Sequence, residues 1–264
     1  IIEGCSHNVH LEKPDEFNKV VKSFALTAGL LASFTSSAEF MDFQVDETPY
    51  GGSVLTADKF NGGYVEELVF NGSGFTTGAF ATMSALYANE GTDVYKGSSS
   101  YLNFGYSVYA ILTASGTSTS GTSFAATSAS LQLYIDVNSD TTSDDLLAGT
   151  TLNNGDDILI ATADDVTNAY GNYDFSAGTG NYNFDFTDFT LTTAGMDYFV
   201  SPAPFYSYLT VNGDYDSLSD LENITGDVSA VFQAVPVSVP EPSTVAVLAL
   251  GLMGLGVSAR RKNK

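Results

Sequence analysis

Oxygen-bearing side chains are concentrated in one short segment, residues 136–145, which directly follows an apolar, strand-like run. Its four candidate ligands are Asp136, Asn138, Asp140 and Asp144. Carboxylate and amide oxygens at alternate positions suit a hard cation such as calcium. The match to a calcium loop of the EF-hand type is partial, because Thr141 stands where glycine is needed and Leu147 where a bidentate Glu is needed. The segment therefore predicts either a calcium site or a solvated hairpin loop.

The side chains that most enzymes use as nucleophiles and bases are missing from most of the chain. The only cysteine is Cys5, the only histidines are His7 and His10, and there is no tryptophan. From residue 39 onward, this composition excludes disulfides, zinc sites and Ser-His-Asp or Cys-His catalysis. Two carboxylates can hydrolyse a glycosidic bond, but in so acidic a chain a pair at suitable spacing is expected by chance. We predict that the protein is not an enzyme and has no obligatory cofactor.

Charge is one-sided between Glu39 and Val239. This stretch contains 26 Asp and Glu but only two basic residues, Lys59 and Lys96, and the whole chain has a formal charge of −22. Such a surface repels nucleic acid and anionic lipid. We therefore expect no nucleic-acid partner, and we expect divalent cations or basic partners to bind in a salt-dependent way.

The C-terminal segment, residues 236–264, has three parts. The first is a motif made of Pro240, Glu241 and Pro242. An apolar run follows over residues 244–259 and predicts a single transmembrane helix, short for a stable span. The basic membrane stop is made of Arg260, Arg261 and Lys262. An apolar helix with a basic end should lodge in the inner membrane with that end in the cytoplasm.

This three-part order resembles the PEP-CTERM sorting signal of Gram-negative bacteria that produce exopolysaccharide. The resemblance implies that an exosortase is a partner and that it cuts near the Pro-Glu-Pro motif. It also implies that the membrane anchor is transient.

Residues 21–38 have the composition of a secretory signal peptide. Lys22 precedes the apolar run Phe24–Phe34, which predicts a signal helix. Ser36 and Ala38 supply the small residues that a signal peptidase reads. We predict Sec export with cleavage after Ala38.

Residues 1–20 precede the predicted signal peptide and do not match the usual start of an exported protein. The stretch Gly4–Phe17 resembles the last loop and helix at the C-terminal end of an α/β-hydrolase, in which His7 would be the catalytic histidine. However, the chain has no G-x-S-x-G nucleophile elbow. We interpret residues 1–20 as a hydrolase-like remnant or a mis-called start, without a catalytic role for His7.

The body, residues 39–235, has an all-β texture, with turn residues between segments rich in Phe, Tyr, Val, Leu and Thr. Predicted strands are Tyr64–Phe70, Phe75–Tyr87, Tyr106–Ala114, Ala125–Asp136, Asp157–Thr162, Tyr182–Thr192, Phe205–Val211 and Asp227–Gln233. No helical segment is long enough for a crossover between parallel strands. This pattern favours an acidic β-sandwich or jelly-roll-like domain.

Several blocks of the body are similar to the flocculation-associated PEP-CTERM proteins. These blocks are Thr56–Glu67, Gly78–Ala81, Tyr109–Gly116, Leu133–Asp136, Val211–Asp216 and Gly226–Phe232. The resemblance extends from about residue 40 to residue 264. It implies a protein of the cell surface or extracellular matrix that promotes cell aggregation with exopolysaccharide or matrix proteins.

Two other functions remain open. The body could be a carbohydrate-binding module of the matrix, which glycan-array binding would reveal. It could also be a glycoside hydrolase of the carboxylate type, which sugar release from purified matrix would reveal.

Overall fold

The computed structural model describes residues 40–95, 99–119, 122–218 and 220–234. The prediction of an all-β fold is confirmed for this part of the chain. The hydrolase-like stretch 1–20, the signal peptide 21–38 and the sorting segment 236–264 lie outside the described residues. Within those residues, no helix has the length and apolar character needed to cross a membrane. The predicted span, 244–259, is not among them.

Sixteen strands and two short helices make up the described chain. The strands are β1 (Phe43–Asp46), β2 (Val54–Ala57), β3 (Lys59–Asn71), β4 (Gly74–Ala88), β5 (Asp93–Val94), β6 (Ser107–Thr119), β7 (Ser123–Asp136), β8 (Thr142–Asp145), β9 (Thr150–Leu152), β10 (Ile158–Ala163), β11 (Val166–Asp174), β12 (Thr179–Phe186), β13 (Thr190–Leu191), β14 (Phe199–Ser201), β15 (Tyr208–Tyr215) and β16 (Ile224–Gln233). The helices are the 3-10 helix η1 (Thr48–Tyr50) and the α-helix α3 (Thr193–Tyr198).

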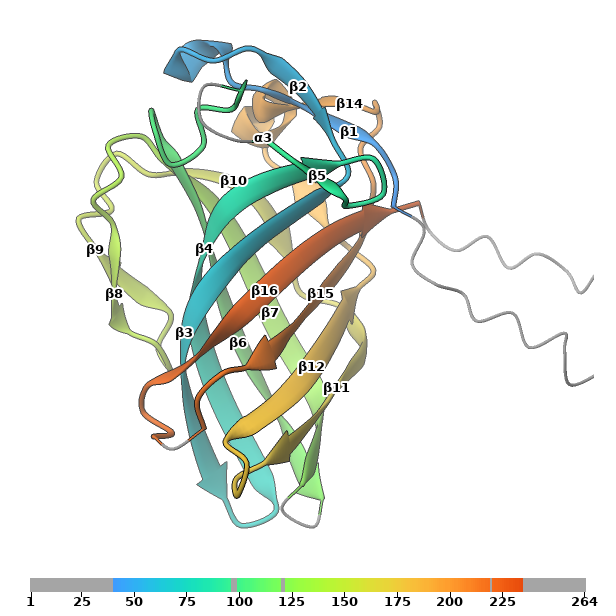
Figure 1. Cartoon of the computed structure of the whole chain (residues 1–264). Coiled ribbons are helices and arrows are strands. Elements are labelled where there is room, and N and C mark those ends of the chain that lie inside the picture. Colours follow the sequence, from blue (N-terminus) through green and yellow to red (C-terminus); the bar gives the residue numbers. More distant parts are fainter. Residues whose placement is uncertain (1–39, 96–98, 120–121, 219, 235–264) are drawn as a thin grey trace, which may run out of the picture. The chain divides into compact units, whose positions relative to one another are not determined.

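Eight of these strands form an antiparallel sheet that closes on itself (Figure 1). Their order is β11, β12, β15, β16, β3, β4, β6 and β7, and β7 pairs again with β11. The closing pairs are Tyr170 with Ala125, Gly171 with Phe124, and Asn172 with Ser123. We call this arrangement the closed sheet. One edge of β7 has two partners. β11 pairs with the start of β7, and β10 pairs with the residues further along it.

Alternation along each strand divides the closed sheet into an interior and an outer face. In β3, for example, Phe60, Tyr64 and Leu68 are buried, whereas Gly63 and Val69 are exposed. A period of two places every second side chain on the same face of a strand. Large interior side chains therefore come from all around the sheet and point toward its centre, as expected for eight strands.

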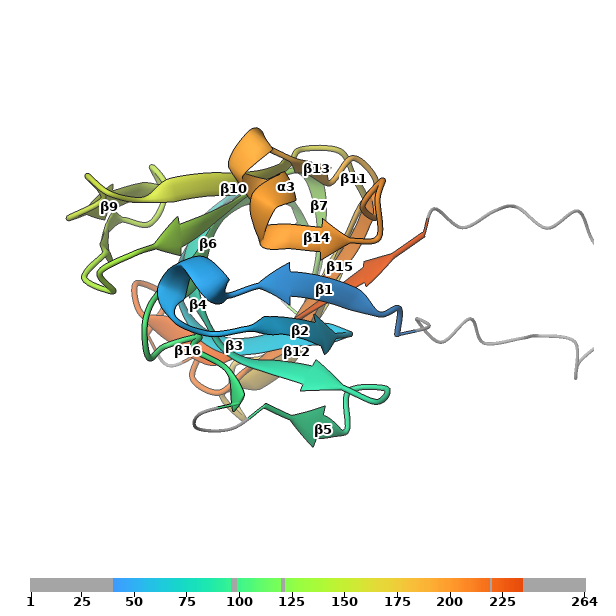
Figure 2. The ribbon, with the colours of Figure 1, turned by 90° about the horizontal axis from the view of Figure 1, so that it is seen from above.

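One end of the closed sheet is covered by β1, β2, β14 and α3, which lie across it when the molecule is viewed from above (Figure 2). Aromatic rings join this lid to the strands below. The Phe43 ring of β1 lies 5.6 Å from Phe60 of β3 and 5.1 Å from Phe232 of β16, centroid to centroid. Phe199 of β14 lies 5.5 Å from the Phe232 ring. These contacts anchor the lid by apolar burial and ring packing.

A buried carboxylate fixes the loops beside the lid. Glu47 is fully buried and accepts hydrogen bonds from Ser100 Oγ at 2.7 Å, from the Tyr101 N–H at 2.9 Å and from Tyr106 Oη at 2.8 Å. The Tyr106 hydroxyl also lies 2.8 Å from that of Tyr198 in α3. Because a buried carboxylate is costly unless it is hydrogen-bonded, this network specifies one arrangement of the loops.

The closing contact depends on a glycine. A Cβ atom at Gly171 would lie 2.3 Å from the Phe124 ring and 2.7 Å from the Asn181 carbonyl oxygen. We expect Gly171→Ala to lower the free energy of unfolding by about 1–3 kcal/mol, the usual cost of overpacking. Urea denaturation followed by circular dichroism measures this change.

Gly155→Ala is the matched control, because a Cβ atom there has no heavy atom within 4 Å. Equal stability losses in the two variants would contradict the importance of close packing at the closure.

Candidate functional site

Polar side chains form ordered rows on the outer face of β11, β12, β15 and β16. The middle row pairs Tyr170 with Asn183, Asn183 with Asn212, and Asn212 with Ser229. Another row pairs Asn172 with Asn181 and Asn181 with Asp214. We call this surface the amide face. Its residues are Asn168, Tyr170, Asn172, Asn181, Asn183, Asp185, Thr210, Asn212, Asp214, Asp227 and Ser229.

A groove of about 430 Å³ lies on the amide face. Its lining includes Tyr170, whose side chain is 54% exposed, and the carboxylates Asp214 and Asp227. The side-chain amides of Asn181 and Asn212 also line the groove, and neither is hydrogen-bonded to another described residue. Their donors and acceptors are therefore available to a ligand.

This arrangement suits a ligand rich in hydroxyl groups. An asparagine amide offers two donors and a carbonyl acceptor, and a carboxylate offers acceptors only. Such groups together can match adjacent hydroxyls of a sugar, which both donate and accept. The Tyr170 ring supplies an apolar surface with a polar tip. The groove has the volume of a small-ligand site, but it opens along a sheet face and so fits a chain better than a compact molecule.

The loop predicted to bind calcium begins with a carboxylate that organises the backbone. Asp136 is 1% exposed, and its oxygens accept N–H groups from Ser139 at 2.7 Å, from Thr141 at 2.9 Å and from Asn138 at 3.2 Å. Aspartate commonly caps turns in this way. These bonds shape the loop after β7 whether or not a cation is bound.

The other three candidate ligands lie further along. Asn138 Oδ1 accepts the Asp140 N–H at 3.2 Å, while Asp144 lies on β8 and accepts from Thr150 Oγ1 at 3.4 Å. Across the described residues, no group of three or more His, Cys, Asp or Glu side chains is placed to hold a metal ion. Calcium binding at this loop stays a prediction.

A second pocket, of about 360 Å³, lies beside this loop and is lined in part by Tyr109, Tyr134 and Asp157. The rings of Tyr109 and Tyr134 stack at 5.0 Å. Asp157 accepts hydrogen bonds from Tyr109 Oη at 2.5 Å and from Thr141 Oγ1 at 2.9 Å. The only carboxylate lining this pocket is thus already engaged by the protein.

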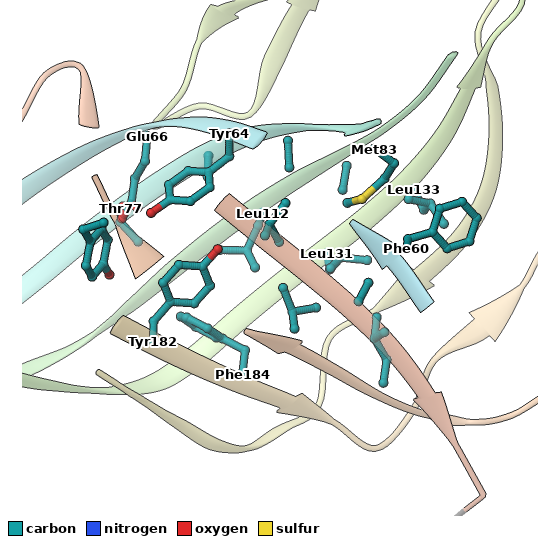
Figure 3. A pocket seen from close by; sticks show the side chains of 18 of the residues that line it. Phe60, Tyr64, Glu66, Thr77, Met83, Leu112, Leu131, Leu133, Tyr182 and Phe184 are labelled. Carbon is teal, nitrogen blue, oxygen red and sulfur yellow. Dashed lines mark hydrogen bonds between the residues drawn. The ribbon is translucent and has the colours of Figure 1, made fainter. Parts of the chain in front are cut away.

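The interior of the closed sheet contains a carboxyl group. Glu66 of β3 is 6% exposed, and its Oε1 lies 2.5 Å from Thr77 Oγ1 (Figure 3). Burial raises the pKa of Glu66 from 4.5 to about 7, although the Thr77 hydrogen bond acts in the opposite direction.

The geometry around Thr77 agrees with a protonated Glu66. Thr77 Oγ1 lies 2.7 Å from the Glu67 carbonyl oxygen as well as 2.5 Å from Glu66 Oε1. A hydroxyl has one proton and can donate to only one of these acceptors. When Glu66 is protonated, its own proton completes the second bond.

The predicted sorting and cleavage residues cannot be placed in the structure. Ser36 and Ala38, the Pro240–Pro242 motif and the basic stop Arg260–Lys262 all lie outside the described residues. The resemblance of residues 1–20 to a hydrolase lies outside them too, and no comparison supports it.

One family model matches the chain. The PEP-CTERM protein-sorting motif is found at residues 238–262, so the expected sorting signal is confirmed. This motif marks an exported protein that is sorted by an exosortase and is held by a C-terminal membrane anchor before processing. Comparisons with curated proteins and with solved structures found no match.

We expect Glu66→Gln to change how stability depends on pH. Because the pKa of Glu66 is raised on folding, the folded protein holds this proton more tightly than the unfolded chain. The wild type should therefore lose about 3 kcal/mol of unfolding free energy as pH rises from about 4.5 to about 7, and no more above that. Urea denaturation at a series of pH values measures the loss.

The difference in unfolding free energy between wild type and Glu66→Gln reports the titration of Glu66 alone, because both proteins contain all the other carboxylates. Glu67→Gln, on the opposite face of β3, is the matched control. A constant difference between wild type and Glu66→Gln across pH 4–8 would show that Glu66 is not held neutral by burial.

Proposed function

We propose that this exported protein acts at the cell surface or in the extracellular matrix of a Gram-negative bacterium, where it promotes cell aggregation by binding exopolysaccharide. The observation that carries the proposal is the amide face. Its unpartnered Asn181 and Asn212 amides lie beside an exposed tyrosine, in a groove open along the sheet. The sorting motif supports the location, because it marks an exported protein that is held by a membrane anchor before processing.

The acidic charge limits the kinds of polysaccharide that fit. The amide face itself carries Asp185, Asp214 and Asp227. An anionic polysaccharide would be repelled at low salt unless divalent cations bridged it. A neutral or amino-bearing polysaccharide would bind directly. Calcium would therefore assist binding to acidic polysaccharides only.

We further propose that the protein works by binding and has no catalytic activity. In the two outer pockets, Asp157 accepts a hydroxyl donor, Asp214 accepts a backbone N–H, and Asp227 lies among asparagine amides. Residues 39–264 contain no histidine or cysteine. The alternatives differ in what they would show. A carbohydrate-binding module would select one glycan on an array, and a hydrolase would release sugar from purified matrix.

The amide face can be tested with two substitutions that remove unpartnered amides. We expect Asn181→Ala combined with Asn212→Ala to weaken binding to purified host exopolysaccharide by about tenfold or more. The reason is that each lost amide removes about one to two hydrogen bonds to the polysaccharide. Co-sedimentation at fixed ionic strength, with and without calcium, measures the affinity. Thr76→Ala combined with Thr82→Ala is the control, since these exposed residues lie on the outer face of β4. Unchanged binding by the asparagine variant would remove the amide face from the proposal.

Aggregation needs a separate test in the organism. Deletion of the gene should reduce floc size and slow settling, and the wild-type gene should restore both. The asparagine variant should restore export but not aggregation. Flocs of normal size after deletion would contradict the role in aggregation.

A further inference from the structure

The interior of the closed sheet contains a cavity of about 60 Å³. Its walls are almost entirely apolar and come from all eight strands of the closed sheet. They include Leu112, Leu131, Leu133, Met83 and Phe184, which are labelled in Figure 3. At about 10–15 Å³ for each water molecule, the space would hold roughly four to six waters, or an alkyl chain of about four carbons. An apolar cavity of this kind favours an apolar occupant over water.

One end of the cavity is polar. Figure 3 shows Glu66 and Thr77 on one side of the view and Met83, Leu133 and Phe60 on the other. Glu66 Oε1 is bonded to Thr77, but Oε2 has no hydrogen-bond partner among the described residues. Glu66 lines the cavity, so this unpartnered oxygen belongs to a buried carboxyl group that faces it.

The hydroxyl groups near Glu66 do not complete its bonds. Tyr64 Oη donates to the Asp214 carbonyl oxygen at 2.8 Å. The Tyr182 ring packs edge-on against Tyr64 at 5.6 Å, and burial raises the pKa of both phenols, so both stay neutral. Glu66 Oε2 is not among the fully enclosed polar atoms that lack a partner, since Asp58 Oδ1 is the one such atom in the described residues. Glu66 Oε2 is therefore open to the cavity and free to bond to the head of a ligand.

We propose that the interior binds a small amphiphile whose apolar body fills the cavity and whose single alcohol or primary amine head bonds to Glu66 Oε2. An amine gains most, because it supplies a positive charge to a buried carboxyl group. At pH 8, above the Glu66 pKa of about 7, Glu66 is ionised, so a carboxylate of the same length is rejected because two like charges would meet in a poorly screened interior. This site is distinct from the amide face, which lies on the outer surface of the same sheet.

Aromatic rings connect the cavity to solvent at the end of the sheet opposite the lid. Phe70 and Tyr173 line the cavity, and their rings lie 6.3 and 4.7 Å from the ring of Phe175, which is 44% exposed. The lid end is filled by the Phe43 cluster. This aromatic cluster is the side of the cavity that lies nearest to an exposed ring.

The test uses the full-length protein in detergent with three probes of equal length: n-butylamine, n-butanol and butyrate. Saturation-transfer NMR and thermal shift at pH 8 report binding. We expect butylamine to bind most tightly, butanol more weakly and butyrate not at all. Glu66→Gln should weaken butylamine by about tenfold or more and leave butanol within about twofold, since it removes the charge but keeps a hydrogen-bonding group.

Two further variants separate cavity binding from surface binding. Ala110→Val, which fills the cavity, should abolish binding of both ligands, whereas Ala85→Val outside the cavity should not. Leu112→Ala should enlarge the cavity and admit n-hexylamine, which keeps the proposal testable if Ala110→Val fails to fold. The amide-face variant should bind butylamine normally. Equal binding of butylamine and butyrate, butylamine binding unaffected by both Glu66→Gln and Ala110→Val, or exclusion of n-hexylamine from folded Leu112→Ala would overturn the proposal.

Discussion

The whole arrangement depends on the pairing of β11 with β7, because this contact closes the sheet. Three residue pairs form its ladder, one of which sets Gly171 against Phe124, and the Tyr173 N–H also donates to the Thr122 carbonyl oxygen. The Phe124 ring lies where a side chain at Gly171 would stand. Without the closure, β11 and the first part of β7 would be free edges, and edges of that kind invite pairing with other chains. Closure also creates an interior, so the cavity and the outer amide face are two results of one contact.

Once the sheet is closed, the period of two along each strand assigns opposite chemistry to neighbouring residues. In β12, Tyr182 and Phe184 face the interior while Asn181 and Asn183 face outward. A shift of one residue in register would bury the asparagines and expose the rings. The aromatic content of the interior therefore holds the asparagine rows in alignment. Conversely, the amide face tolerates polar side chains on every strand because none of them is needed for the core.

The sequence predicts the strands better than it predicts how they are joined. All eight predicted strands overlap observed ones, since their alternation is strong. The sequence does not predict β11, because Asn168, Gly171 and Asn172 interrupt the apolar alternation that identifies a strand. The amide rows could not be found either, since their members lie far apart in sequence and meet only through strand register. The burial of Glu66 could not be predicted either, because the residue type does not distinguish it from the neighbouring Glu67.

Stability in this domain has to arise without disulfides and almost without cations. Lys59 is the only basic residue in the described part of the chain, and its ammonium lies over the Tyr87 ring at 4.4 Å. Several acids are satisfied in another way. Asp136 accepts backbone N–H groups, Asp188 accepts those of Asp164 and Asp165, and Glu47 accepts hydroxyl and backbone donors. The buried Asp58 Oδ1, by contrast, has no partner among the described residues. Because these bonds do not rely on ion pairs, salt should not weaken the fold by screening attractive contacts; it should instead screen the repulsion among the acids and favour the compact state. The negative charge is also left free to act on external partners, so ionic strength and divalent cations should regulate their association with the protein.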